Sequence, residues 1–311
     1  MKRLALASWL LFVGVAAGCD SSPGAGDDDA GGGTDGGVVT GDGGTTTVDG
    51  GTGYTETVCS DPLASLADLQ AAYQNTAAGI RAAALGIADR RYPIGRLFIE
   101  HETDSDLARW FQTTANFAGI LDGFDTAVHE GQHGWDISMI TGGRWPYRIR
   151  EDLIIRPLRL NNFARSEIVA LHADAANDFY LNVYLTGQSG TQGFNNLLDE
   201  YNAYTHSLAA RYCTRDSLPG GTRVTARDGI LTMMYYVELY LKVARMSHPA
   251  DYAAIKADPE HLRLILTIWD RAEFWLARSA STASLGIKDA TIRTWVYDPA
   301  NKMEIDLLRT P

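Results

Sequence analysis

Several patterns that indicate common classes of protein are missing from this sequence. Its glycine-rich stretches lack the lysine of a phosphate-binding loop, and no Gly-x-Ser-x-Gly nucleophile elbow occurs. The apolar run Leu4 to Val15 is too short for a transmembrane helix, and no internal repeat of fixed period appears. Basic residues are outnumbered by acidic residues, 27 to 38, which argues against nucleic acid as a partner.

Residues 1–18 have the features of an export signal. Lys2 and Arg3 precede the apolar run, which ends at Ala16-Ala17-Gly18-Cys19. This ending resembles a bacterial lipobox, although Ala16 stands where leucine is usual, and the resemblance implies cleavage before Cys19 and lipidation of that residue. An ordinary secretory signal is the alternative. Both interpretations predict an exported chain. The lipobox also predicts a lipid anchor in a membrane of the bacterial cell envelope, facing the periplasm or the cell surface.

Residues 19–55 are predicted to be a disordered tether. Between Asp20 and Tyr54 the chain is almost wholly Gly, Asp, Thr, Ser and Val, with seven Asp and no basic residue. Such a segment cannot bury enough apolar surface to offset the entropy lost on ordering. A flexible chain of about 35 residues has a root-mean-square reach of roughly 30 Å. Of the net charge of −11, the signal contributes +2 and the tether −7, which leaves −6 for the rest.

The three cysteines agree with export. Cys19 is the predicted lipidation site, which leaves Cys59 and Cys213 as a pair in a compartment that permits disulfides. A disulfide between them would tie the start of the folded region to its middle. Two free buried thiols are the alternative, because the sequence does not give their distance.

Residues 56–311 are predicted to form one predominantly helical α+β domain with a small sheet. A short apolar run over residues 92–100 follows Pro93 and suits a strand, and residues 144–157 alternate as one or two strands do. The segment Ile230 to Val243 is apolar nearly all round, which predicts a central buried helix. The predicted helices cover residues 63–85, 105–123, 124–140, 162–186, 193–212, 227–246, 259–280 and 287–296.

The segment His129-Glu130-Gly131-Gln132-His133 is the most informative pattern. Histidines four apart on a helix share one face, so both can bind one Zn²⁺, and Glu130 can take a proton from a metal-bound water. With seven histidines in the chain, chance supplies on the order of 0.01 such matches. The alternative is two polar residues in an ordinary helix. Gly131 and Gly134 each cost the helix about 1 kcal/mol relative to alanine, which is tolerable if a strand or a substrate packs close.

The His-Glu-x-x-His pattern resembles the zincin superfamily of metallopeptidases, and the resemblance covers one helix. It implies a zinc cofactor, a peptide or protein substrate, and a zincin-like fold with the sheet beside the motif helix. The metzincin form requires glycine and histidine where Asp136 and Met139 stand. The aminopeptidase-type spacing requires glutamate where Asp152 stands. What remains is a gluzincin-like arrangement of no identified subgroup, with a glutamate on a later helix as third ligand.

Two glutamates are the main candidates for that third ligand. Glu200 lies on a predicted helix with Ala203 three residues later, and this pattern resembles the Glu-x-x-Ala helix of several gluzincins. Glu167 lies early in the first long helix predicted after the motif, where many gluzincins keep their ligand. Each of them could instead pair with an arginine or cap a helix. The remaining candidates are Glu151, Asp152, His172 and Glu238.

The resemblance also implies a mechanism. Zinc would lower the pKa of its bound water toward 7, and Glu130 would act as general base and then deliver the proton to the leaving amine. A donor from another helix would stabilise the oxyanion, and Gln132 and Asp136 could orient the ligands. The possible oxyanion donors are Tyr201, Tyr204, His172 and His206.

The leading hypothesis from the sequence is therefore an exported, lipid-anchored zinc metallopeptidase. The first alternative is a binding or scaffold lipoprotein that keeps a zincin-like helix without turnover. The second is a zinc hydrolase that acts on a non-peptide amide. The partners implied are a peptide or protein substrate and, through Cys19, a membrane.

Overall fold

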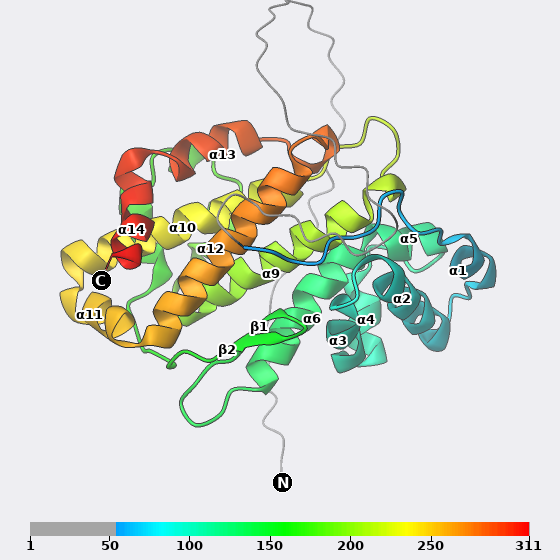
Figure 1. The fold of residues 1–311 in the computed structure, drawn as a ribbon, viewed down its shortest axis with the longest axis horizontal. Coiled ribbons are helices and arrows are strands. Elements are labelled where there is room, and N and C mark those ends of the chain that lie inside the picture. The colour runs from blue at the N-terminus through cyan, green and yellow to red at the C-terminus, as the bar shows by residue number, and fades with distance from the viewer. Residues whose placement is uncertain (1–53, 311) are drawn as a thin grey trace, which may run out of the picture. The chain divides into compact units, whose positions relative to one another are not determined.

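The computed structural model describes residues 54–310. This part of the chain is mostly helical and contains one small antiparallel sheet, so the prediction of a predominantly helical α+β fold is confirmed at that level (Figure 1). The predicted signal at residues 1–18, Cys19 and the predicted tether as far as residue 53 lie outside the described residues. Within residues 54–310, no helix has both the length and the apolar composition that crossing a membrane requires.

The helices differ greatly in length, and the long ones form the centre of the fold. The α-helices are α1 (Ala67–Ala72), α2 (Ala77–Arg91), α3 (Gly95–His101), α4 (Asp104–Trp110), α5 (Phe117–Asp122), α6 (Phe124–Ser138), α7 (Leu181–Tyr184), α8 (Gly187–Gly190), α9 (Phe194–Cys213), α10 (Ala226–Ser247), α11 (Pro249–Ala257), α12 (Pro259–Ser279), α13 (Asp289–Val296) and α14 (Pro299–Arg309). The strands are β1 (Tyr147–Arg150) and β2 (Leu153–Ile155), and the 3₁₀ helices are η1 (Arg165–Leu171), η2 (Ala175–Asn177), η3 (Arg215–Ser217) and η4 (Ala283–Leu285).

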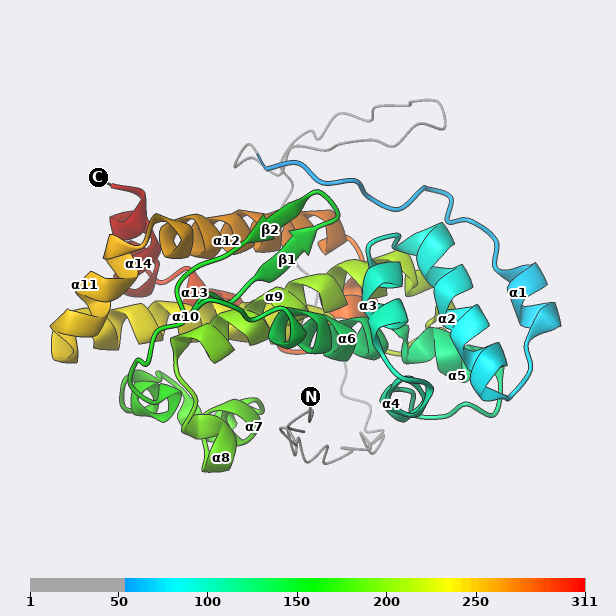
Figure 2. The ribbon, with the colours of Figure 1, turned by 90° about the horizontal axis from the view of Figure 1, so that it is seen from below.

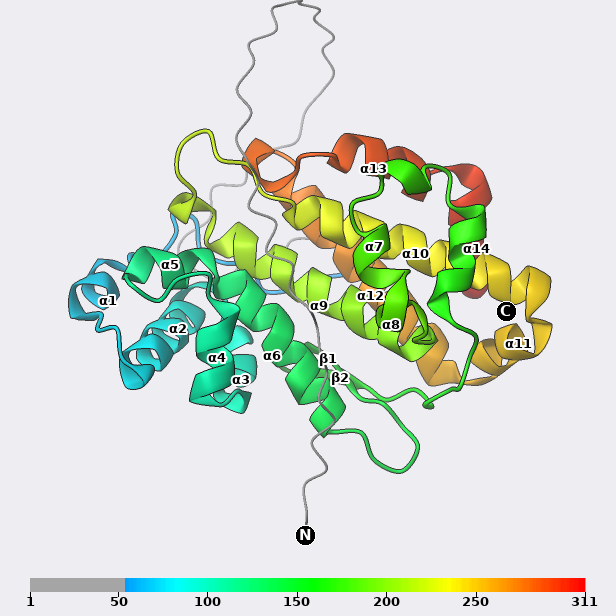
Figure 3. The ribbon, with the colours of Figure 1, turned by 180° about the vertical axis from the view of Figure 1, so that it is seen from behind.

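Helices α9 and α10 lie side by side in the core. Helix α9 also packs against α6 and α12, and α10 also packs against α13 and α14 (Figures 1 and 3). From Ile230 to Val243 every residue of α10 except Lys242 is buried, which confirms the predicted central helix. Figure 2 shows α12 on one side of α9, and α7 and α8 on the other. Because α6 and α9 pack along each other, side chains from distant parts of the sequence meet between them.

The sheet is a hairpin of β1 and β2 that lies beside α6, α9 and α12. Tyr147 pairs with Ile155, and both side chains are fully buried. The pairing shifts between Arg148 and Arg150, which is the irregularity of a β-bulge. The strands predicted within residues 144–157 are confirmed.

The N-terminal arm, residues 54–66, is fixed to the core at two points. Cys59 and Cys213 form the predicted disulfide, with a Cα–Cα distance of 5.5 Å, and it joins the arm to the end of α9. Glu56 accepts two hydrogen bonds from the fully buried Arg271 of α12, at 2.7 and 2.8 Å. A buried, bidentate ion pair of this kind orders both partners. The arm is thereby part of the domain.

The strand predicted at residues 92–100 is wrong, because this run forms α3. Ile94, Leu97 and Phe98 are spaced for one face of a helix as well as for a short strand, so the pattern alone is ambiguous. Packing decides in favour of the helix. A Cβ atom on Gly131 would lie 2.8 Å from the carbonyl oxygen of Phe98, so this glycine allows α3 to approach α6 closely. A helix, not a strand or a substrate, occupies the space that Gly131 leaves.

Three predicted helices are also interrupted. The run 63–85 divides into α1 and α2, because Thr76 caps α2 by accepting the Gly79 amide hydrogen. The run 105–123 divides into α4 and α5 where Asn116 caps the second helix. Residues 162–186 form only η1, η2 and α7, in a region where Asp178 accepts hydrogen bonds from the backbone and from side chains. Helices α11 and α14 were not predicted, although each begins with a proline, a usual first residue.

Candidate metal centre

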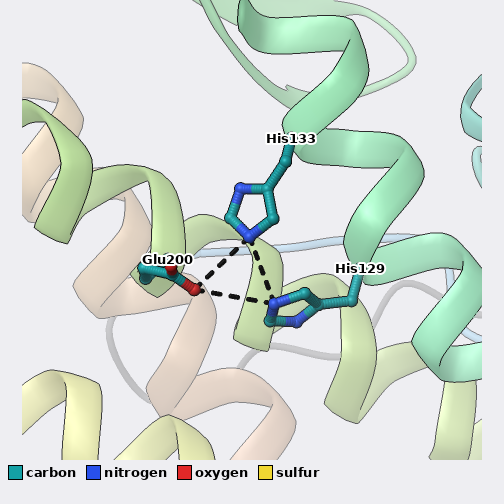
Figure 4. A group of neighbouring side chains, drawn as sticks. All are labelled: His129, His133 and Glu200. Atoms are coloured by element: carbon teal, nitrogen blue, oxygen red, sulfur yellow. Dashed lines mark hydrogen bonds and ion pairs between the residues drawn. The ribbon is translucent and has the colours of Figure 1, made fainter. Parts of the chain in front are cut away.

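Helices α6 and α9 carry the residues of the candidate site. Helix α6 matches the predicted motif helix, and its buried face includes Phe124, Ala127 and Val128. This packing places His129 and His133 toward α9, one helical turn apart. Glu200 of α9 points at both imidazoles (Figure 4).

The three side chains have the spacing of ligands around one ion. The Nε2 atoms of His129 and His133 are 3.2 Å apart, and Glu200 Oε2 lies 3.3 Å from His133 Nε2 and 3.6 Å from His129 Nε2. Ligand atoms about 2.05 Å from a tetrahedral zinc are about 3.3 Å from one another. His129 and Glu200 each have an exposed fraction of only 8%. Two imidazoles and one carboxylate therefore form a group that fits a metal ion, although the donor set alone does not identify the metal.

Glu167 lies outside this group. Its Oε2 is 2.9 Å from His248 Nε2, and both side chains are partly exposed. Of the two main candidates for the third ligand, the structure thus brings only Glu200 to the histidines. The four remaining candidates also have other surroundings. Glu151 and Asp152 are exposed between the two strands, His172 Nε2 lies 2.7 Å from Asp178, and Glu238 is buried within α10.

Asp199 is a functional candidate that the sequence analysis did not single out. Its Oδ2 lies 2.7 Å from His133 Nδ1, which leaves Nε2 of that ring directed at His129 and Glu200. A carboxylate on the far nitrogen of a histidine fixes the ring and makes it a stronger ligand. The available signal was the acidic pair Asp199-Glu200, whose members lie on neighbouring parts of one helical face.

Gln132 and Asp136 support this arrangement, as their positions on the motif helix predicted. Gln132 donates hydrogen bonds to Asp136 and, at 3.3 Å, to Asp199. The second oxygen of Asp136 accepts the backbone amide hydrogen of Arg148 at 3.0 Å, which connects the group to β1. The histidine ring is thus held by a network that extends from α6 to α9 and to the sheet.

Charge is concentrated at the site. Burial alone would raise the pKa of Glu200, but its interactions with His133 and His129, and the charge of Arg165, hold that pKa well below the usual range. Burial alone would lower the pKa of His133, whereas Asp199 and Glu200 raise it well above the usual value. Burial raises the pKa of Glu130, the predicted general base, and the two histidines limit that rise. Glu200 is therefore anionic at neutral pH and available to a cation.

Glu130 lies beside a second glutamate that sequence reasoning missed. A Cβ atom on Gly134, one helical turn beyond Glu130, would lie 2.7 Å from Glu102 Oε1, so the carboxylate of Glu102 fills the space that this glycine leaves. Glu102 also accepts a hydrogen bond from Trp110 Nε1 at 3.2 Å. Burial raises the pKa of Glu102, and the negative charges of Asp106 and Glu130 contribute to the rise.

The three candidate ligands His129, His133 and Glu200 are called the metal group below. Of the four possible oxyanion donors, Tyr204 is the one whose ring packs against a side chain of this group. Its ring packs edge-on against His129, with centroids 4.8 Å apart, and its hydroxyl lies 2.7 Å from the hydroxyl of Tyr184. Burial raises the pKa of both tyrosines well above the usual value, so both keep their protons. The others lie elsewhere: His206 is bonded to Tyr92 and Arg148, His172 to Asp178, and the Tyr201 hydroxyl has no partner in the described region.

Comparison of the chain with models of protein families, with curated proteins and with solved structures found no match. The site is thus described by its own geometry. That geometry offers two imidazole nitrogens and one carboxylate to a cation, with a protonatable glutamate and a tyrosine pair beside them.

Proposed function

We propose that this protein is a zinc-dependent metallopeptidase of the zincin type, with His129, His133 and Glu200 as zinc ligands. The observation that carries the proposal is the set of mutual distances of 3.2 to 3.6 Å between their ligand atoms. Further support comes from Asp199 on the far nitrogen of His133, an arrangement typical of zinc-binding histidines. Because three protein ligands leave the fourth position of a tetrahedral ion open, the set suits a catalytic site better than a structural one.

The side chains around the ligands have distinct roles in this proposal. Zinc held there would supply Lewis-acid activation of water and of the scissile carbonyl group. The Glu130 carboxylate takes the proton of the attacking water and later delivers it to the leaving amine, and its raised pKa suits a group that both accepts and donates. The Tyr204 hydroxyl donates a hydrogen bond to the oxygen that becomes negative, which requires the Tyr184 hydroxyl, 2.7 Å away, to act as the donor in the pair and so fix the orientation of Tyr204.

The proposed setting is the bacterial cell envelope, with the catalytic domain carried on a lipid anchor at Cys19. The disulfide between Cys59 and Cys213 supports an oxidising compartment. A tether of the kind that the sequence predicts for residues 19–55 would let the domain reach peptide or protein substrates near the membrane surface.

Zinc content and peptide cleavage, measured on matched variants, test the proposal. We expect one zinc per chain in the wild type and in Glu130→Gln, and loss of zinc in His133→Ala and Glu200→Gln. Glu167→Gln is the matched control and should keep its zinc. Against a casein digest or a peptide library, Glu130→Gln should lose about 10²- to 10⁴-fold in kcat/KM.

Two outcomes would overturn this proposal in different ways. Loss of zinc in Glu167→Gln but not in Glu200→Gln would show that Glu167, and not Glu200, is the third zinc ligand. If wild-type protein and Glu130→Gln bind zinc and are equally inert toward peptides, the protein is a binding lipoprotein or acts on a non-peptide amide.

A further inference from the structure

Arg165 is buried, charged and incompletely bonded. It is the first residue of η1, and its exposed fraction is 0%. Its Nε donates to the Ser189 carbonyl oxygen at 2.9 Å, and its Nη2 donates to the Ser189 hydroxyl at 2.6 Å. Its Nη1 has no hydrogen-bond partner among residues 54–310. A buried guanidinium that lacks a bonded carboxylate is unfavourable unless another interaction compensates it.

This guanidinium is linked to the metal group by its electrostatic interaction with Glu200 and by a series of aromatic contacts. Burial lowers the pKa of the Arg165 guanidinium, and the negative charge of Glu200 opposes that shift. The Arg165 Cζ atom is 5.4 Å from the ring centroid of Tyr184, whose hydroxyl meets Tyr204, and Tyr204 packs on His129. A continuous set of contacts therefore connects Arg165 to a metal ligand.

The hydrogen bonds of Arg165 to Ser189 do not account for its charge, although that charge also helps to keep Glu200 anionic. Nε and Nη2 hold the chain at Ser189, and an uncharged donor could do the same. Beside a site that binds a cation, a second positive charge opposes metal binding. The charge is favourable when the site also holds an anion, because the two free N–H groups of Nη1 can then donate charge-assisted hydrogen bonds to it.

We propose that Arg165 binds the free carboxylate of the substrate, so that the metal centre prefers peptides whose C-terminal carboxylate lies close to the scissile bond. This inference rests on the proposed peptidase function. Ser189, which accepts both hydrogen bonds of the guanidinium, belongs to the four-residue helix α8, and local opening of this short element would expose Nη1 while α7 and its Tyr184 stay in place. The carboxylate would thus reach Nη1 without rearrangement of α6 or α9.

Matched peptides test this inference. A set of N-acetylated tripeptides that samples all side-chain classes is prepared with free C-terminal carboxylates and again with C-terminal amides. For the zinc-loaded wild type we expect kcat/KM to be about 10- to 100-fold higher for the free acids, as charge-assisted hydrogen bonds imply. In Arg165→Gln this ratio should fall to near 1, through loss of activity toward the acids and not toward the amides.

Two further variants separate recognition from stability. Arg165→Lys keeps the positive charge but lacks the planar guanidinium with its paired N–H donors. This variant should keep part of the preference for free acids. Arg91→Gln removes an equally buried arginine that holds other loops and pairs with Asp216, so it should lower stability and leave the ratio unchanged. A wild-type ratio of kcat/KM near 1 would overturn the inference, and so would a ratio that Arg165→Gln does not change. The wild-type ratio can be measured even if the variant fails to fold.

Binding to the zinc-loaded Glu130→Gln protein separates this inference from the peptidase proposal. Isothermal titration should give tighter binding of the acids than of the amides, with the same dependence on Arg165. If neither form is cleaved by the wild type but the acids still bind more tightly, the peptidase proposal fails and the carboxylate site stands. If both forms are cleaved equally well, only the carboxylate site fails.

Discussion

At the scale of single residues, Asp199 shows how the metal group depends on a side chain that contacts no metal. It holds His133 through Nδ1 and is itself held by Gln132. The sequence identified both histidines and Glu130 because they lie within one helical turn. It left Glu200 and Glu167 as alternatives and missed Asp199, because the docking of later segments on α6, which is a tertiary property, decides which of these carboxylates reaches the histidines. Glu102 was missed for the same reason, since α3 brings it over Gly134.

The first prediction concerns Asp199. Asp199→Asn removes the negative charge behind His133 while keeping a side chain of the same size. We expect zinc affinity to fall about 10- to 100-fold, as measured by competition with a chromogenic chelator. Asp152→Asn, on an exposed carboxylate between the two strands, is the control. Unchanged affinity in Asp199→Asn would show that the aspartate does not support the ligand.

The second prediction concerns Glu238, whose exposed fraction is 0% and whose two carboxylate oxygens have no hydrogen-bond partner in the described region. Burial raises its pKa from 4.5 to about 10. The folded protein therefore keeps Glu238 protonated at neutral pH, while the unfolded chain ionises above about pH 4.5. Between these values the unfolded state binds fewer protons, so this residue lowers stability progressively as pH rises toward 10.

Glu238→Gln removes this titration. Between pH 5 and pH 9 the free energy of unfolding of the variant, relative to the wild type, should rise by up to about 1.4 kcal/mol per pH unit. Urea denaturation of both proteins at several pH values measures the difference. A difference that stays constant with pH would mean that Glu238 is not held protonated.

At the scale of elements, the glycines show that close helix packing determines where the side chains of the site lie. Residue Gly229 of α10 leaves room for the ring of Tyr204, because an added Cβ atom would lie 2.3 Å from Tyr204 Cε1. The ring is held between α10 and His129. A pattern of apolar residues predicts that α10 is buried, yet it does not reveal which of its residues must be small.

The third prediction follows from this contact. Gly229→Ala should displace the Tyr204 ring from His129 and lower the kcat of the proposed peptidase by about 10-fold or more, although alanine itself favours the helix by about 1 kcal/mol. Gly229→Ala combined with Tyr204→Leu should recover stability in thermal denaturation but not activity. Gly86→Ala, which meets only the flexible end of Leu69, is the matched control. Full activity in Gly229→Ala would show that the ring position does not matter.

The apolar patterns of the individual elements explain which of them could be predicted from the sequence. Helices α6, α9, α10 and α12 and the hairpin carry long or regular apolar patterns, so their sequences define them. Residues 162–186 also look helical, but contacts with the rest of the molecule divide them. Asp178 accepts a hydrogen bond from Tyr236 of α10, and Arg165 is bonded to Ser189 of α8. Such long-range partners have no signature in a local pattern.

At the scale of the whole molecule, the disulfide links parts of the domain that lie 154 residues apart in the sequence. A loop of that length gives a cross-link a large effect on the entropy of the unfolded chain. The fourth prediction is that Cys59→Ser with Cys213→Ser lowers the free energy of unfolding by about 3 to 5 kcal/mol in urea denaturation. Because neither cysteine contacts the metal group, the folded variant should bind zinc as the wild type does. An unchanged denaturation midpoint would contradict the prediction.

The ion pair between Glu56 and Arg271 has a practical consequence for recombinant production. A shortened chain that begins after Glu56 would leave the Arg271 guanidinium without its carboxylate in the protein interior, and removal of one partner of a buried pair typically costs about 3 to 5 kcal/mol. Fusion tags and cleavage sites therefore belong upstream of Tyr54, whose hydroxyl also donates to Glu56. The folded unit is thus longer than the helices alone suggest, because it includes the arm of residues 54–66 before α1.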